Sequence, residues 1–265
     1  MSRCWAGLIT VLTLAVCAPS ADATVLFSAS GGGLSASASF SITGNSGNTR
    51  TLTILLTNTD VANGVGEPTA ASQVLTGLFF NLGTTTFTPV SATLVNGGQI
   101  IQTGNCDVNC SGKTNVGGEF SYASGGANWL AGTNQGISSS GYLNANTSSG
   151  NFNGTNYDNP NALDGINFGI VPDGWTPYQG NGGLDGVALV DGTVQFVLTI
   201  PKGLSESDIK NVYFTYGTSK NEGTLHATTN GSVTTSGTTV PEPATLSMLG
   251  LAMAGLGYRL RRRKS

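Results

Sequence analysis

The stretch "LSASASFSI", from Leu34 to Ile42, decides the fold class, because apolar and hydroxyl side chains alternate along it without a break. Successive side chains of a strand point to opposite faces, so Ala36, Ala38, Phe40 and Ile42 fall on one face and the serines on the other. A period of two is typical of a strand with one buried face. This stretch therefore predicts a β-strand at the surface of an apolar core.

Similar runs elsewhere predict that the whole body, residues 24–239, is all-β. They are rich in β-branched and aromatic residues and are bounded by Gly, Asn, Ser or Pro: "TVLFSAS" (24–30), "RTLTILLTNT" (50–59), "VLTGLFFNL" (74–82), "GEFSYA" (118–123), "TVQFVLTI" (193–200) and "NVYFTYGT" (211–218). The helical candidate is "GLSESDIKN", with Ser205 as N-cap of one or two turns. We expect a β-sandwich or jelly-roll-like fold with long Gly/Asn/Ser-rich loops.

The pattern loosens between Asn96 and Gly192, where Gly, Asn and Ser dominate and aromatic residues stand alone. Long loops inside a compact domain often carry function, so a ligand would be sought here. A carbohydrate-binding module would need exposed, coplanar aromatic rings such as Trp129, Trp175 and Tyr178. This interpretation stays open as one alternative for the function of the body.

The charge balance excludes one class of partner. Charged residues make up 9% of the chain. Between Thr24 and Val240 there are five Lys and Arg against twelve Asp and Glu, a net charge of −7. Nucleic-acid binding needs a cationic surface, so no nucleic-acid partner is expected.

The first 23 residues have the organisation of a secretory signal peptide. Arg3 supplies a positive start, an apolar stretch runs from Trp5 to Val16, and Ala21-Asp22-Ala23 is a small-x-small cleavage site. Cleavage would leave Thr24 as the first residue. An uncleaved membrane anchor and a lipoprotein attached through Cys17 are the alternatives.

The last 26 residues, 240–265, are built differently from the body. Pro241-Glu242-Pro243 precedes an uncharged stretch of 15 residues from Ala244 to Tyr258, about 22 Å long as a helix. Five Arg and Lys between residues 259 and 264 follow it. By the positive-inside rule they stay in the cytoplasm, so this helix would span the membrane with the body outside. A buried amphipathic helix of the body is the alternative.

This C-terminus resembles the PEP-CTERM sorting signal of exported proteins of Gram-negative bacteria. The segments "LTGLFFNLG" (75–83) and "IKNVYFTYGTS" (209–219) also resemble parts of some surface proteins of this kind. The resemblance implies recognition of Pro241, Glu242 and Pro243 by an exosortase, an integral-membrane enzyme. It further implies transient membrane anchoring, processing, and release to the cell surface or the extracellular space, commonly alongside exopolysaccharide.

Two cysteines remain after signal-peptide removal, Cys106 and Cys110 in "CDVNC". An even count in an oxidising compartment predicts a disulfide between them. A free pair or a pair of metal ligands is the alternative.

Catalytic chemistry is not indicated. The single histidine, His226, would have to serve any Ser or Cys triad, and a lone histidine near a strand end is typically structural or exposed. A glycoside hydrolase needs only two carboxylates across a cleft, for which the candidates are Glu119, Asp158, Asp164, Asp173, Asp185 and Asp191. The last four of these precede glycine, which favours turns; a calcium site among them is a further alternative. The sequence therefore predicts a non-enzymatic protein without catalytic residues, metal or cofactor. The resemblance to PEP-CTERM proteins implies a cell-surface or matrix protein with a structural or adhesive role, and with exosortase and exopolysaccharide as partners.

Overall fold

The structure is a computed structural model. It describes residues 23–60, 70–102, 112–125, 130–140, 152, 154–158, 163, 165–175, 183–218, 222–227 and 232–235, the last four and residue 45 by their backbone alone. The described strands belong to one compact unit from Asp22 to Ser236. They form one hydrogen-bonded sheet of 13 strands, so the predicted all-β class is confirmed.

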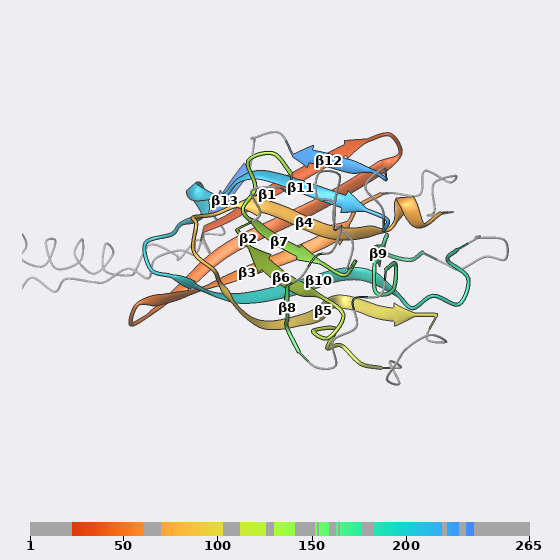
Figure 1. The fold of residues 1–265 in the computed structure, drawn as a ribbon, viewed down its shortest axis with the longest axis horizontal. Helices are drawn as coiled ribbons and strands as arrows, with labels where there is room; N and C mark the ends of the chain where they lie inside the picture. The colour runs from red at the N-terminus through yellow and green to blue at the C-terminus, as the bar shows by residue number, and fades with distance from the viewer. Residues whose placement is uncertain are drawn as a thin grey trace, which may run out of the picture. The chain divides into compact units, whose positions relative to one another are not determined.

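One arm of the sheet contains its longest strands. The order is β13-β1-β2-β3-β10-β5, and all these neighbours are antiparallel. The strands are β1 (Ala23–Gly31), β2 (Leu34–Ser46), β3 (Thr49–Asn58), β5 (Thr88–Ile101), β10 (Leu189–Pro201) and β13 (Ser232–Thr235). The turn between β1 and β2 and the turn between β2 and β3 lie at opposite ends of this first arm (Figure 1).

The second arm is built from shorter strands, in the order β12-β11-β4-β7-β6-β8. They are β4 (Leu75–Asn81), β6 (Ser121–Ser124), β7 (Gln135–Ser138), β8 (Thr155–Asn156), β11 (Lys210–Tyr216) and β12 (Thr224–Ala227). The segments 75–83 and 209–219 thus supply the paired neighbours β4 and β11.

A strand of two residues, β9 (Ile170–Val171), joins the two arms. It pairs in parallel with β10, and Ile170 also lies opposite Leu75 of β4. The arms share a core: Phe40 of β2 contacts Phe80 of β4 edge-on at 5.3 Å between ring centroids, and Phe196 of β10 contacts Phe120 at 5.0 Å. Buried residues of both arms belong to one core cluster, and the strands form one large open sheet; the finer prediction of a β-sandwich or jelly-roll stays a prediction.

The strands predicted from alternation are found close to their expected bounds, whereas β5 was not predicted. Its 14 residues contain Pro89 and the sequence Asn96-Gly97-Gly98. The pairing of β10 with β5 is irregular at both places, between Asp191 and Thr193 and between Val197 and Leu198. Bulges of this kind interrupt the period of two on which the prediction depends.

The predicted helical segment is a single 3₁₀ turn, Glu206–Asp208, with Ser205 as the residue before it. The Asp208 carboxylate accepts hydrogen bonds from the Ser205 backbone N–H at 2.9 Å and from its hydroxyl at 2.7 Å. These bonds favour the ionised form and hold the pKa of Asp208 below its usual value. Glu206 accepts a bond from the Ile42 backbone N–H at 2.7 Å, which ties the turn to β2.

Candidate functional site

The outer side of the first arm is an array of hydroxyl groups. On β1, β2, β3 and β5 most of the alternate side chains that do not enter the core are Ser or Thr, and on β10 Thr193 and Thr199 are; none of these hydroxyl residues is buried. We call this surface the hydroxyl face. Its hydroxyl residues are Thr24, Ser28, Ser30, Ser35, Ser37, Ser39, Ser41, Thr43, Thr51, Thr53, Thr57, Thr88, Ser91, Thr93, Thr193 and Thr199.

The strand register aligns these side chains in rows across the arm. Ser28 lies opposite Ser37, Ser37 opposite Thr57, and Thr57 opposite Thr193. Residues opposite one another have Cβ atoms about 4.5–5.5 Å apart, and residues two apart along a strand are about 7 Å apart. The rows therefore form a two-dimensional lattice of short polar groups.

Two hydroxyl pairs at this face are hydrogen-bonded to each other. Thr57 Oγ1 and Thr193 Oγ1 are 2.8 Å apart, and Ser35 Oγ lies 2.7 Å from Thr59 Oγ1. Other outward positions on these strands include Leu26, Leu55, Val95, Gln195 and Val197, and Val90, at the irregularity near the start of β5, is 53% exposed. None of the outward residues on these strands carries a charge.

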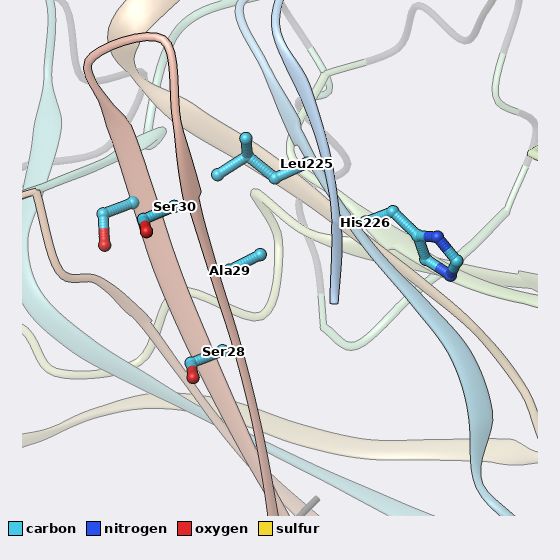
Figure 2. Close-up of a pocket in the computed structure, with 6 residues that line it drawn as sticks. Ser28, Ala29, Ser30, Leu225 and His226 are labelled. Atoms are coloured by element: carbon cyan, nitrogen blue, oxygen red, sulfur yellow. The ribbon is translucent and has the colours of Figure 1, made fainter. Parts of the chain in front are cut away.

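A cavity of about 490 Å³ lies at the β1 edge of the hydroxyl face. It is lined by Ser28, Ala29, Ser30 and Ser35 on one side and by Leu225 and His226 of β12 on the other. Figure 2 shows Leu225 directed toward the β1–β2 hairpin. Ala29 and Leu225 also pack against the main core, so the cavity has a partly apolar floor.

The single histidine is turned away from the serines of this cavity. The imidazole of His226 points to the opposite side from Ser28 and Ser30 in Figure 2. It stacks on the ring of Tyr213 with 4.1 Å between centroids and an interplanar angle of 8°. This arrangement does not place the imidazole where it could take a proton from either serine.

The described carboxylates considered for hydrolysis or calcium binding lie on separate turns and strands. Asp173-Gly174 and Asp185-Gly186 occupy turns closed by Trp175 N–H to Pro172 O at 3.0 Å and by Val187 N–H to Leu184 O at 3.3 Å. Both glycines have positive φ, so these two turn predictions are confirmed. In the described part of the chain, no three His, Cys, Asp or Glu side chains are grouped closely enough to hold a metal ion.

Asp158 and Glu119 belong to the segments around β6 and β8. The Asn115 side-chain amide donates to Asp158 Oδ2 at 2.7 Å. The backbone N–H of Asp158 donates to Gly117 O at 3.0 Å, and that of Glu119 to Val116 O at 3.0 Å. These bonds fold the segments locally. Asp164 lies outside the described residues.

The turn prediction for Asp191-Gly192 is wrong, because both residues lie within β10. Asp191 is buried, and its carboxylate accepts bonds from the Gly174 backbone N–H at 2.9 Å and from the Gln99 side-chain amide at 3.1 Å. Gly192, at φ +105°, forms the bulge where β10 passes close to Gly98 of β5. Asp191 thus fixes the 172–175 turn to the sheet.

A half-buried acidic residue, Asp60, follows the end of β3. Asp60 Oδ2 and the Tyr216 hydroxyl are both buried and have no hydrogen-bond partner among the described residues. Burial raises the pKa of Asp60. Burial likewise raises the pKa of Tyr216, and the neighbouring charge of Asp60 adds to that rise. Burying these two polar groups without hydrogen-bond partners lowers the stability of the fold locally.

In the irregular region, residues 96–192, the aromatic side chains that the structure describes belong to the core. Phe120, Tyr122, Phe152, Tyr157, Phe168 and Trp175 are all buried. Trp175 is therefore not an exposed ring for a sugar, contrary to the role considered for it. The other two rings of that alternative, Trp129 and Tyr178, lie outside the described residues.

Several sequence-based predictions fall on residues that the structure does not describe: the signal peptide up to residue 22, Cys106 and Cys110, and Pro241, Glu242 and Pro243 with the apolar segment behind them. Within the described ranges, no helix has the length and apolar character needed to cross a membrane.

Comparison with known proteins identifies the C-terminus. The model of the PEP-CTERM protein-sorting motif matches residues 239–263. No curated protein matches the chain, and no solved structure does. The motif indicates an exosortase-dependent exported protein that is sorted to the cell surface.

Proposed function

We propose that this exosortase-dependent exported protein is a structural, adhesive component of the cell surface or extracellular matrix, linked to exopolysaccharide. In this proposal residues 1–23 are removed as a signal peptide and residues 240–265 hold the chain in the membrane transiently. Exosortase recognises Pro241, Glu242 and Pro243 and releases the body, residues 24–239. The PEP-CTERM motif at residues 239–263 is the observation that carries the proposal.

A structural rather than catalytic role is supported by the chemistry of the described residues. The His226 ring stacks on Tyr213 and points away from the nearby serines. The Asp191 carboxylate accepts hydrogen bonds from Gly174 and Gln99 within the fold. The broad hydroxyl face is the kind of extended neutral surface that an adhesive protein would use.

The sorting step can be tested by fractionating cells that produce the full chain. The wild-type protein is expected in the surface or matrix fraction, with an intact mass that lacks "RLRRRKS". Replacing Pro241, Glu242 and Pro243 together by alanine should retain the chain, with its tail, in the membrane fraction.

A control replacement just before the matched segment, Ser236→Ala combined with Thr238→Ala, should be processed like the wild type. Equal release of the Pro-Glu-Pro variant would refute recognition through these residues. A wild-type surface form that still carries the basic tail would refute processing.

A further inference from the structure

We propose that the hydroxyl face is a binding surface for neutral polysaccharide chains, which it contacts along their length rather than at one sugar. The inference rests on the proposed function, because it names the polymer-binding surface and narrows the class of polymer. Three features of the face carry it: its lack of charge, its lattice of hydroxyls and its outward-facing leucines, Leu26 and Leu55.

The lack of charge selects against ionic partners. All outward residues of the face are uncharged, although the body as a whole has a net charge of −7. Arg50 of β3 donates its guanidinium bonds to the backbone carbonyls of Ile42, Gly44 and Leu204. A polyanion would meet an acidic protein with no cationic contact on this face, so a neutral polymer is the better partner.

The hydroxyl lattice fits a partner that is itself covered with hydroxyl groups. Each Ser or Thr hydroxyl can donate one hydrogen bond and accept two, as a sugar hydroxyl can. Even where Thr57 and Thr193 bond to each other, one hydroxyl still has a free donor and both have free acceptor positions. Thr is branched at Cβ and therefore stiff at χ1, so little conformational freedom is lost when a ligand binds.

The leucines supply apolar contact for the C–H faces of sugar rings. Leu26 of β1, which is 40% exposed, and Leu55 of β3 lie on either side of Ser39 in one row. The cavity beside β1 extends the polar row past Ser28 and Ser30 toward Leu225. A chain lying across the rows would thus meet hydroxyl and apolar groups in turn.

The same features predict binding to polymers but not to single sugars. No aromatic side chain occupies an outward position of β1, β2, β3, β10 or β5 on this face, so there is no platform to hold one ring tightly. Each hydroxyl contact exchanges for a water contact and contributes little. Many such contacts on one polymer add up through effective concentration.

The test is co-sedimentation of the purified full chain with cellulose powder and with dextran beads, compared with alginate beads as the polyanion. Binding to at least one neutral polymer is expected, equally in low and high salt and without competition by glucose. Thr53→Val, Thr57→Val and Thr193→Val, combined, keep the shape and strand propensity of the face but remove three hydroxyls. This variant should bind about tenfold or more weakly.

Two controls separate hydroxyl chemistry from damage to the fold. Thr53→Ser, Thr57→Ser and Thr193→Ser, combined, keep the hydroxyls and should bind like the wild type. Thr224→Val on the exposed side of β12 changes a hydroxyl off the face and should also bind normally. Circular dichroism melts of each variant report whether the body remains folded.

Several results would overturn the inference: binding to neither neutral polymer, salt-sensitive binding to alginate alone, or unchanged binding of the valine variant. The inference would also be overturned if the wild type dimerised and the valine variant did not, because the face would then bind a second copy of the chain. The proposed function is tested separately by the matrix fraction of cells. If the wild type is retained in the matrix fraction and the valine variant is retained to the same extent, the hydroxyl face is refuted as the binding surface, while the proposed function stands.

Discussion

Tyr122→Phe should lower the stability of the body substantially, because the Tyr122 hydroxyl joins two buried groups. It donates a short hydrogen bond to Gln135 Oε1 and accepts one from the Phe87 backbone N–H at 2.9 Å. The Gln135 amide in turn donates to the carbonyl oxygens of Leu82, Gly83 and Thr85. The network therefore fastens the connection between β4 and β5 to strands β6 and β7.

The magnitude follows from the groups that lose their partner. The substitution keeps the ring, which stacks on Phe87 at 5.9 Å between centroids. It leaves one buried acceptor and one buried donor unpaired, each at about 1–3 kcal/mol. We expect the free energy of unfolding to fall by about 2–4 kcal/mol, or the Tm by roughly 5–15 °C for a body of this size.

The assay is urea unfolding of the wild type, Tyr122→Phe, Gln135→Met and the double variant. The two substitutions should be coupled by about 1–2 kcal/mol, because Gln135→Met removes the acceptor that Tyr122→Phe leaves unpaired. Tyr213→Phe, on a half-buried ring, should cost less than about 0.5 kcal/mol. A Tyr122→Phe cost no larger than this control, or no coupling in the cycle, would refute the network as a source of stability.

Three further measurements test other parts of the molecule. Gly192→Ala should lower the free energy of unfolding by about 2 kcal/mol or more, since its φ is +105° and an added Cβ would lie 3.0 Å from the backbone of β5. Gly97→Ala, at φ +85° with open space around it, should cost about 1–2 kcal/mol. If Gly97→Ala cost more than Gly192→Ala, the close approach of Gly192 to Gly98 would not be the source of the larger loss. The raised pKa of Asp60 means that its contribution to stability is greatest below its ordinary value of 3.8 and is lost as the pH rises through the folded-state value. Asp60→Asn should therefore stabilise the body at neutral pH but not below pH 3.8 in urea melts across the pH range, and an equal gain at both would contradict the assignment. Cys106 and Cys110 should be found bonded to each other by non-reducing peptide mapping, with little loss of stability when both are replaced because the loop is short; two free thiols would reject the bond.

The strands that sequence reasoning predicted are those whose pattern is local. In β2 apolar residues alternate with polar ones from Leu34 to Ile42, and in β10 Val194, Phe196, Leu198 and Ile200 recur at every second position, so the buried face can be read directly. The first half of β5 also alternates around Ala92 and Leu94, but Pro89 and the Asn96-Gly97-Gly98 bulge break the period on either side. Pairing with β10 stabilises this strand, and that partner lies about 100 residues further along the chain.

The short strands of the irregular region depend even more on distant partners. β7 has four residues, Gln135–Ser138, that are all buried, so no alternation marks it as a strand. It lies between β4 and β6, which satisfy its backbone groups on both sides. The isolated aromatics around it could be recognised in the sequence, but their burial could not, because burial depends on these non-local pairings.

The hydroxyl face follows from the same alternation that builds the core, yet its extent could not be predicted from any one strand. The inward residues of β2, Ala36, Ala38 and Phe40, fix which side of the strand faces out, and Ser follows at every outward position from Ser35 to Ser41. Only the register brings these serines into line with the threonines of β3 and β10. Surfaces of soluble proteins usually intersperse charges that limit association, and a broad sheet face without them lacks that protection. The hydroxyl face of this exported protein spans five strands without an outward charge. Among the described surfaces it is therefore the one best suited to binding a neutral partner.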